Sequence, residues 1–501
     1  MNDNAIRRIV IVGGGTAGWM AAAPLALRLA GPDKRCEVTL VESPEIGTIG
    51  VGEATLPTIR FYNAALGLDQ DDFVAKTQAS YKLGIEFKDW GHLGNRFFHG
   101  FGDFGLALAG LPPHTHWLRL AGAFDQMPAL ENWSLASVMA RENKFIPPNK
   151  TQPGLTDSYS YGFHFDAGLY ANYLRDYALA RGAQRIEGMV VAVEQHPETG
   201  FITALKLRDG RRVEGDLFID CSGFRGLLIE DALHAGYDDW SAQLPCNSAQ
   251  AVPCASVETL TPYTRSTAKE AGWIWRIPLQ HRTGNGHVYS DAFTTDAQAR
   301  DTLLAALDGA ALDEPRQLRF VTGRRRKSWV KNCVAMGLAA GFVEPLESTS
   351  IHLIETAVGK LIELFPDRDF RPELAEEFNR VMGARYESVR DFIILHYKLT
   401  ARDDSEFWRY CANMTIPESL RHQIELFRET GRVTVLDRDG FAEPSFVAML
   451  AGLGVQPKRY DPFADAVDIR QVHGHFAGLR DLIAQAAAKM PTHGAYVKAQ
   501  R

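Results

Sequence analysis

A glycine-rich turn between a strand and a helix, close to the N-terminus, constrains the fold of this chain more than any other feature. Apolar residues 9–12 predict a buried strand, and Gly13-Gly14-Gly15-Thr16-Ala17-Gly18 follows directly, before an alanine-rich helix. In this G-x-G-x-x-G spacing, glycines let backbone N–H groups approach a pyrophosphate at the helix N-terminus. A second predicted strand, 37–41, ends at Glu42, whose carboxylate is placed to accept hydrogen bonds from ribose hydroxyls. The pattern predicts a Rossmann-type α/β fold that binds a dinucleotide, and it does not separate FAD from NAD.

A second segment, 216–225, favours FAD. Its apolar residues predict a strand that ends at Asp220, and a turn at Gly223 follows. A strand, an aspartate and a glycine turn in this order resemble the second dinucleotide motif of flavin monooxygenases. A buried strand with an ordinary turn would give the same pattern, and this alternative stays open.

Composition and charge exclude several classes of partner. The net charge of the 501 residues is −7, whereas nucleic acids and anionic membranes select basic surfaces. No apolar run reaches the roughly 18 residues of a membrane span. The six cysteines form no C-x-x-C pair, so we expect no metal site, and the missing signal peptide favours a reducing cytoplasm. His114 and His116, in a proline-rich loop, are expected to be solvent-exposed rather than a metal pair.

The distribution of predicted elements divides the chain into two modules. Residues 1–105 and 155–365 mix strands and helices and are assigned to an FAD-binding module of the flavin-monooxygenase type. Residues 106–154 and 366–501 are assigned to a mostly helical substrate-binding module. In the latter, helical periodicity predicts helices at 373–399, 418–429 and 477–489, and Pro372 opens the first of them.

Three further stretches resemble the flavin-dependent tryptophan halogenase family. They are Gly50-Val51-Gly52-Glu53-Ala54-Thr55 followed by Ser80-Tyr81-Lys82, then Gly272-Trp273-Ile274-Trp275-Arg276-Ile277-Pro278, and finally residues 341–350 (GFVEPLESTS). With the two dinucleotide motifs they lie in the family's order between residues 9 and 355. From spacing alone, the two tryptophans on one strand face would be core residues. The resemblance implies instead that they form a wall beside the flavin.

The resemblance also implies a role for individual residues. Lys82 and Glu347 match the catalytic lysine and carboxylate of the family. Thr349 and Ser350, at the start of a predicted helix, would hold a halide ion, although many family members have glycine where this chain has Ser350. The residues implied to flank the substrate or its tunnel are His99, Phe101, Trp273, Trp275 and Ser348. The residues implied to bind the cofactor are Gly13, Gly15, Thr16, Ala17, Gly18, Glu42, Gly52, Glu53, Ala54, Thr55, Asp220 and Gly341.

The implied activity is chlorination or bromination of an electron-rich aromatic ring, with reduced FAD and oxygen. Halide is oxidised to hypohalous acid, which Lys82 guides to the ring, by a hydrogen bond or as a haloamine. Because the chain has one complete dinucleotide fingerprint, a separate flavin reductase would supply reduced FAD by diffusion. An aromatic hydroxylase that reduces its own flavin with NAD(P)H is the alternative, and a homodimer is left open.

The substrate prediction rests on a missing feature. Tryptophan halogenases clamp the amino acid with aromatic residues late in the chain, whereas the last tryptophan here is Trp408. Phe446 is a candidate for a substitute apolar wall. We therefore expect a free indole-type ring rather than free tryptophan.

Overall fold

The computed structural model describes residues 4–31, 36–45, 52–149, 154–435 and 440–500. The chain forms two compact units, each made of three segments. The first unit contains Met1–Ala79, Phe165–Ser241 and Phe320–Glu387, and the second contains Ser80–His164, Ala242–Arg319 and Ser388–Arg501. The α/β fold is as predicted, but the compact units follow other boundaries than the predicted modules: residues 80–105 and 242–319 belong with the helical C-terminal part. The assignment of one ligand to each module stays a prediction.

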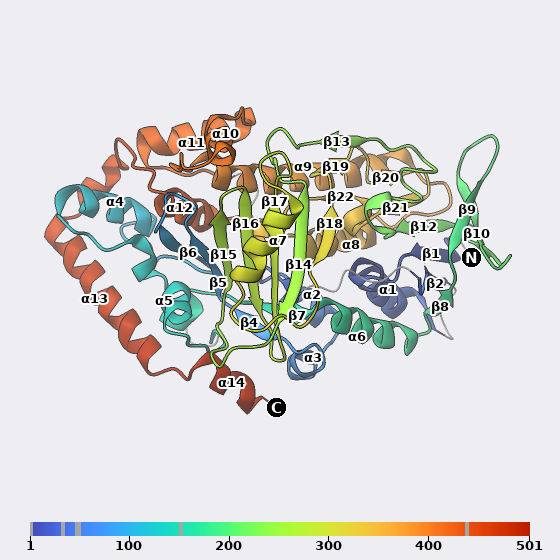
Figure 1. Ribbon diagram of the computed structural model, residues 1–501, viewed down its shortest axis with the longest axis horizontal. Helices are drawn as coiled ribbons and strands as arrows, with labels where there is room; N and C mark the ends of the chain where they lie inside the picture. Colours follow the sequence, from blue (N-terminus) through green and yellow to red (C-terminus); the bar gives the residue numbers. More distant parts are fainter. Residues whose placement is uncertain (1–3, 32–35, 46–51, 150–153, 436–439, 501) are drawn as a thin grey trace. The chain divides into compact units, whose positions relative to one another are not determined.

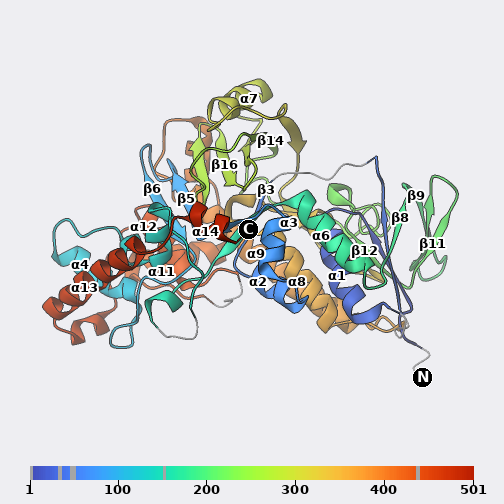
Figure 2. The same ribbon diagram turned by 90° about the horizontal axis from the view of Figure 1, so that it is seen from below.

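The first unit is built on a parallel sheet with the order β20-β21-β12-β1-β2-β8. Strands β1, β2, β8, β12 and β21 run parallel, and β20 is antiparallel to β21. Helix α1 packs against α6, β2 and α8 (Figures 1 and 2). The sheet strands are β1 (Arg8–Val12), β2 (Glu37–Glu42), β8 (Gln184–Glu187), β12 (Leu217–Asp220), β20 (Trp329–Val330) and β21 (Cys333–Ala335).

The remaining strands of the first unit form two small antiparallel sheets, with the orders β11-β10-β9 and β13-β19-β22. The strands are β9 (Val190–Gln195), β10 (Ile202–Leu207), β11 (Arg212–Glu214), β13 (Tyr237–Asp239), β19 (Gly323–Arg325) and β22 (Gly341–Phe342), with β3 (Gly52–Ala54) elsewhere in this unit. The helices are α1 (Thr16–Leu29), α2 (Ile59–Ala65), α3 (Gln70–Lys76), α6 (Ala167–Leu179), α8 (Ser350–Glu363) and the first part of α9 (Pro372–Lys398).

The second unit is built on a larger, mostly antiparallel sheet with the order β18-β14-β17-β16-β15-β5-β6. Strand β4 pairs separately with β7. The strands are β4 (Ser80–Lys82), β5 (Gly84–Lys88), β6 (Arg96–Gly100), β14 (Ser248–Cys254), β15 (Thr264–Lys269), β16 (Gly272–Pro278), β17 (Thr283–Tyr289), β18 (Arg316–Arg319) and the first three residues of β7 (Gly162–Asp166). The helices are α4 (Pro113–Ala123), α5 (Leu135–Arg141), α7 (Asp296–Ala305), α10 (Glu406–Asn413), α11 (Glu418–Thr430), α12 (Glu443–Gly452), α13 (Ile469–Ala488) and α14 (His493–Ala499), besides the end of α9.

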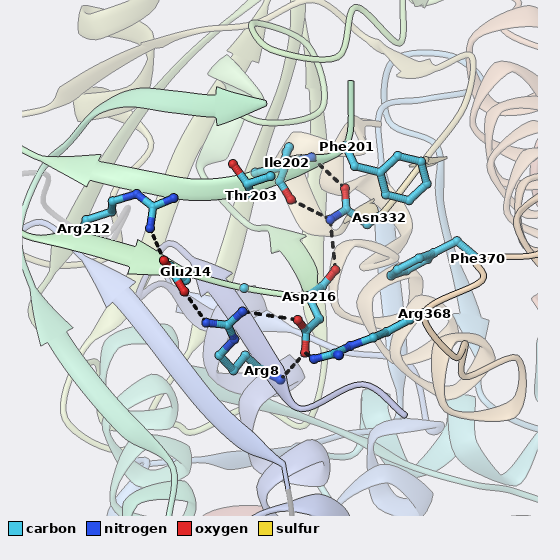
Figure 3. Close-up of a pocket in the computed structure, with 11 residues that line it drawn as sticks. Arg8, Phe201, Ile202, Thr203, Arg212, Glu214, Asp216, Asn332, Arg368 and Phe370 are labelled. Carbon is cyan, nitrogen blue, oxygen red and sulfur yellow. Dashed lines mark hydrogen bonds and ion pairs between the residues drawn. The ribbon is translucent and has the colours of Figure 1, made fainter. Parts of the chain in front are cut away.

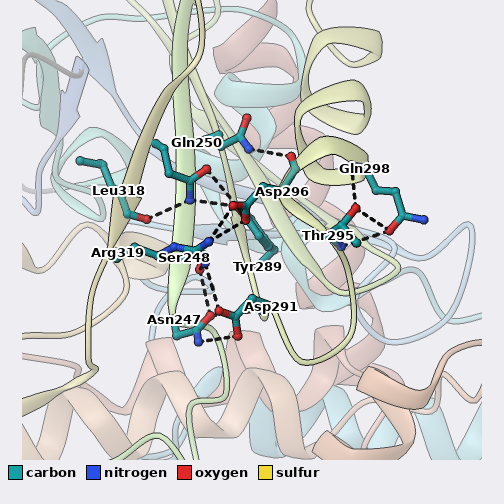
Figure 4. A network of polar contacts seen from close by, with 11 residues as sticks. Asn247, Ser248, Gln250, Tyr289, Asp291, Thr295, Asp296, Gln298, Leu318 and Arg319 are labelled. Carbon is teal, nitrogen blue, oxygen red and sulfur yellow. Dashed lines mark hydrogen bonds and ion pairs between the residues drawn. The ribbon is translucent and has the colours of Figure 1, made fainter.

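Polar contacts hold one end of this sheet to α7. Arg319 on β18 donates to Asp291 and to both carboxylate oxygens of Asp296, the first residue of α7. The Tyr289 hydroxyl, on β17, donates to the same Asp296 (Figure 4). Each of these side chains forms a hydrogen bond with another residue of the network, so the network holds α7 to this end of the sheet.

The helical part of the second unit has its own apolar core. Phe104, Leu120, Trp133, Val447 and Phe476 belong to one buried cluster, and the Trp133 indole N–H donates to the Phe476 carbonyl at 2.8 Å. Helix α13 lies alongside α4 and α5 (Figures 1 and 2). It begins eight residues before its predicted start.

The early start of α13 has a local cause. Asp468 precedes the helix, and its carboxylate accepts hydrogen bonds from the Arg470 and Gln471 amides. This is N-capping, which satisfies amide groups that a helix start leaves unpaired. The helices predicted at 373–399 and 418–429 are confirmed as α9 and α11.

Candidate active site

The predicted glycine turn of the first unit is confirmed in its strand–turn–helix setting. Gly13 has φ of +110°, and a Cβ there would lie 2.2 Å from the Cys221 carbonyl oxygen. A Cβ on Gly18 would lie 1.8 Å from the Gly13 carbonyl oxygen. Both positions require glycine because the backbone segments approach each other too closely for a side chain.

The outer side of the same turn has the space and polarity that a dinucleotide needs. Gly15 is the N-cap of α1, and a Cβ there would meet nothing within 4 Å. No side chain caps this helix start, so backbone N–H groups of Thr16 and Ala17 at the first turn can serve a pyrophosphate. The Glu42 carboxylate lies beside Gly14 and pairs with Arg185. These residues fit FAD by shape and by donor set.

Asp220 lies at the end of β12, where the sequence predicted it, and its carboxylate is already engaged. One oxygen accepts from the Ser222 amide at 2.9 Å, and the other accepts from the Leu228 and Ile229 amides at 2.7 and 2.8 Å. The side chain therefore shapes the turn after β12. Its role in cofactor binding stays a prediction, and it would act through the backbone of that turn.

The first family stretch is described only from Gly52 onward, and Gly50 and Val51 lie outside the described residues. Residues 52–54 form the short strand β3, and Thr55 is fully buried. Burial raises the pKa of the Glu53 carboxyl to about 7. Its carboxyl can therefore carry a proton near neutral pH.

The third family stretch forms a tight loop that leads into α8. Gly341 lies where a Cβ would meet the Gly323 carbonyl oxygen at 2.7 Å, so it lets β22 pack on β19. Glu347 is fully buried, and Ser348 follows in the left-handed conformation, with φ of +61°. A non-glycine residue in this conformation stores strain and is often found at functional sites.

Thr349 is the N-cap of α8, as the sequence predicted, but its hydroxyl does not cap the helix. The side chain is fully buried, and its Oγ1 atom has no hydrogen-bond partner among the residues that the structure describes. Ser350 begins the helix. The first turn of α8 thus combines a buried hydroxyl with helix-start amides, which suits a small anion.

A largely buried carboxyl lies further along α8. The pKa of Glu355 is raised to about 8 by burial, against an opposing hydrogen bond from Thr58. Its Oε1 atom has no hydrogen-bond partner among the described residues, and its Oε2 atom is 3.9 Å from His352 Nδ1. This carboxyl is therefore protonated at neutral pH.

In the second unit, Lys82 lies at the end of β4 with 0% of its surface exposed. Its Nζ atom is 5.0 Å from the centroid of the Phe101 ring, within the range of a cation–π contact. His99 is also buried, and its ring centroid is 6.4 Å from that of Phe101. A lone lysine usually lies at the surface, whereas the structure buries Lys82 among aromatic rings.

The two tryptophans of β16 lie together. Trp273 and Trp275 are buried, with ring centroids 6.1 Å apart. The Trp275 indole lies over Gly286 of the neighbouring strand, where a Cβ would be 2.0 Å from Cζ2. Trp273 also contacts Trp90 at 6.4 Å. A rigid indole wall therefore exists in this unit, and its relation to the flavin stays a prediction.

Sequence reasoning missed part of the aromatic surroundings. Phe392 and Phe441 stack with centroids 3.8 Å apart, and both contact His99, at 5.8 and 6.4 Å. Phe446, the predicted substitute wall, contacts Phe392 at 4.9 Å. Phe392 lies on α9, where helical periodicity indicated only an apolar position, and no sequence signal marked Phe441.

The expectation for His114 and His116 is wrong. Both lie in α4 and are buried, and the carbonyl oxygens of Gly431 and Leu108 give their Nε2 atoms hydrogen-bond partners at 3.2 and 3.0 Å. Among the described parts of the chain, no group of three or more His, Cys, Asp or Glu side chains could hold a metal ion.

The first unit has a surface hollow of about 380 Å³, which is partly lined by polar residues that contact one another (Figure 3). The Asn332 amide donates to the carbonyl oxygens of Ile202 and Asp216. Arg8 and Arg368 both pair with the Asp216 carboxylate. These polar groups are engaged with one another, and their contacts link β1, β10 and the residue that precedes β12.

Comparison with known proteins decides the family. The model of the tryptophan halogenase family matches residues 8–469. This chain belongs to the tryptophan halogenase family. The tryptophan 6-halogenase SttH of Streptomyces toxytricini is 35% identical over 510 residues, which cover 96% of each chain. The tryptophan 7-halogenase RebH of Lentzea aerocolonigenes is 34% identical, over 91% of each chain.

Solved structures agree with this family. BrvH, a flavin-dependent halogenase from Brevundimonas sp. BAL3, superposes with a TM-score of 0.95 at 45% identity, covering 99% of this chain and 100% of that one. Xcc4156, a flavin-dependent halogenase from Xanthomonas campestris, gives 0.94 at 42% identity, with 99% and 98% covered. The prediction of a flavin-dependent halogenase is confirmed, and the hydroxylase alternative is not favoured. In the described ranges, no helix is both long and apolar enough to cross a membrane.

Proposed function

We propose that this halogenase chlorinates or brominates a free indole-type ring, with Lys82 as the residue that delivers the halogen. The observation that carries this proposal is the fully buried Lys82 ammonium beside the Phe101 ring. A lysine normally keeps its charge in water, so its burial in an aromatic setting favours a chemical role.

The residues of the first unit support binding of FAD and halide. The glycine turn and Glu42 would hold the dinucleotide, and Thr349 Oγ1 with the first amides of α8 would hold the halide. When bound and reduced, the flavin supplies, together with oxygen, the two-electron oxidation of halide to hypohalous acid. A separate flavin reductase would provide the reduced cofactor.

Lys82 would donate a hydrogen bond from Nζ to the hypohalous acid and so orient the halogen toward the ring. The hydroxyl of the hypohalous acid would take a proton from Lys82 Nζ and leave as water, while the ring gains a carbon–halogen bond and then loses a proton. Glu347, buried in the first unit, would accept that proton. The tryptophan pair would keep water and substrate apart from the oxidising step.

The aromatic residues near His99 favour a ring without a charged tail. Phe392, Phe441 and Phe446 offer apolar faces, and none of these side chains carries a charge that could pair with the carboxylate of an amino acid. A free indole loses little hydration at such a surface, whereas free tryptophan would have to bury two charges.

A competition assay tests the substrate. The enzyme, with FAD, a flavin reductase, NADH, air and bromide, receives equal amounts of indole and tryptophan, and mass spectrometry measures both brominated products. We expect bromoindole to exceed bromotryptophan by about tenfold or more, since one unpaired buried charge costs at least that factor. Equal or preferential bromination of tryptophan would overturn the substrate assignment while leaving the halogenase activity intact.

A further inference from the structure

The strand that carries Lys82 is short, and two histidines from distant parts of the chain bond to it. Strand β4 contains only Ser80, Tyr81 and Lys82, which pair with His164, Phe163 and Gly162 of β7. Three residues of antiparallel pairing give limited rigidity. The Tyr81 ring stacks on Phe145 with centroids 4.2 Å apart, and His164 and His493 add hydrogen bonds to the strand; all of these residues lie in the second unit.

His493 bonds to the backbone of this strand. It is the first residue of α14, near the C-terminus, and is fully buried. The Tyr81 amide donates to His493 Nε2 at 3.1 Å, and His493 Nδ1 lies 2.9 Å from the Leu260 carbonyl oxygen. Because a carbonyl only accepts, Nδ1 carries the proton. Because Nε2 accepts, it carries none, and the ring is neutral.

His164 bonds to the side chain at the other end of the strand. The Ser80 hydroxyl donates its single proton to the Pro278 carbonyl at 2.6 Å, so Ser80 Oγ accepts from His164 Nδ1 at 3.1 Å. His164 Nδ1 therefore carries a proton, as in His493. His164 Nε2 lies 3.0 Å from Thr264 Oγ1, whose hydroxyl can donate to it when the ring is neutral.

The surroundings of both rings favour the neutral state. Burial lowers the pKa of His493 to about 4. Burial, and next the charge of Lys82, lower the pKa of His164 well below its usual range. A protonated ring at either position would lose an acceptor, and at His164 it would place a second positive charge near Lys82.

We propose that His164 and His493 are positioning residues that, as neutral rings protonated on Nδ1, hold strand β4 and thereby the Lys82 ammonium in place. Helix α14 thus becomes part of the scaffold of the active site, because its first residue bonds to the backbone next to Lys82. The proposal rests on the proposed function of Lys82. In this proposal the two histidines act through β4 and do not themselves contact the reacting atoms.

Paired variants separate the hydrogen bond from the bulk of the ring. His493→Gln keeps an acceptor near the position of Nε2, and His493→Leu removes it. His164→Asn keeps a donor near the position of Nδ1, and His164→Leu removes it. His114→Leu is the matched control, because His114 is also buried, with a pKa lowered to about 4 by burial, but bonds to the Gly431 carbonyl.

The first readout is independent of catalysis. Hydrogen exchange of the Tyr81 amide, followed in the full-length protein, should accelerate about tenfold in His493→Leu, as expected for loss of one buried hydrogen bond, and stay near wild type in His493→Gln and His114→Leu. Nitrogen-15 spectra of the histidine rings should show both as neutral, with the proton on Nδ1, from pH 8 to pH 6. Unchanged exchange in His493→Leu, or a proton on Nε2 of His493, would overturn the proposal.

The second readout uses bromide and indole. Each leucine variant should form about tenfold less bromoindole per NADH consumed, with little change in KM for indole, because halide oxidation continues while delivery fails. The Gln and Asn variants should recover most of this yield. Equal losses in Leu and Gln or Asn variants would indicate a packing role and overturn the proposal. If the wild type formed no bromoindole, the proposed function would fail, and the exchange experiment would still decide whether His493 holds the strand.

Discussion

The two units build their candidate sites from different materials. In the first unit, backbone amides, glycines and a helix start would form the proposed cofactor and anion sites, and the side chains mainly shape turns. In the second unit, the proposed chemistry relies on side chains: a buried ammonium, two imidazoles and a set of aromatic rings. A site made of backbone groups should tolerate many nearby substitutions but lose binding when a required glycine is replaced. A site made of side chains should lose activity when one functional group is removed.

The sharpest test of this difference is Lys82→Met, which removes the ammonium and keeps the apolar stem. Formation of halogenated product should fall on the order of 100-fold or more, as for loss of a charged group at a reacting centre. FAD affinity, measured by flavin fluorescence, should not change, because the glycine turn belongs to the first unit. Unchanged product formation would remove Lys82 from the mechanism.

The corresponding test in the first unit is Gly13→Ala. The new Cβ would collide with the Cys221 carbonyl, and alanine strongly disfavours a φ of +110°. FAD affinity should fall by about tenfold or more, measured by equilibrium dialysis. Gly359→Ala is the control, since a Cβ there meets nothing within 4 Å. Normal FAD binding by Gly13→Ala would show that the turn is less constrained than the contacts indicate.

A packing test addresses the tryptophan wall. Gly286→Ala would place a Cβ against the Trp275 indole, and overpacking of this kind should lower the free energy of unfolding by about 1–3 kcal/mol. Denaturant unfolding measures this change. The double variant Gly286→Ala/Trp275→Phe should recover part of the loss, because the smaller ring makes room, and a further loss would contradict the proposed collision.

A test of stability against pH concerns the proton on Glu355. Its pKa is about 8 in the folded chain and near 4.5 when unfolded, so the unfolded state releases the proton first as pH rises. The free energy of unfolding should therefore fall between about pH 4.5 and pH 8, by on the order of 1 kcal/mol for each pH unit. Glu355→Gln should flatten this part of the profile, measured by urea unfolding at pH 5, 6.5 and 8. An equally steep profile in the variant would assign the dependence to another group.

The same contrast explains what the sequence could predict. The turn from Gly13 to Gly18 and the strand ending at Glu42 are local patterns, so spacing alone predicted their structure. Lys82 and Thr349 needed a family resemblance, because one lysine or threonine in a sequence has no pattern of its own. Asp220 was placed correctly at its strand end, but its bonds to three amides depend on the path of the following turn.

The hydrogen bonds that His164 and His493 make to β4 could be predicted neither from local spacing nor from the family resemblance. His164 and His493 are more than 300 residues apart in the chain, and only tertiary packing brings both to β4. Each is a single polar residue in an otherwise ordinary segment. The place of Phe441 near His99 likewise depends on stacking on Phe392, which lies 49 positions earlier in the chain.

One measurement tests the central claim most directly. The wild-type chain is incubated with FAD, a flavin reductase, NADH, air and bromide in the presence of indole, and the products are analysed by mass spectrometry beside the Lys82→Met variant. We predict the bromine isotope pattern on indole with wild type and its near-complete loss with the variant. Hydroxylated indole without bromine, or equal bromination by both proteins, would contradict this account.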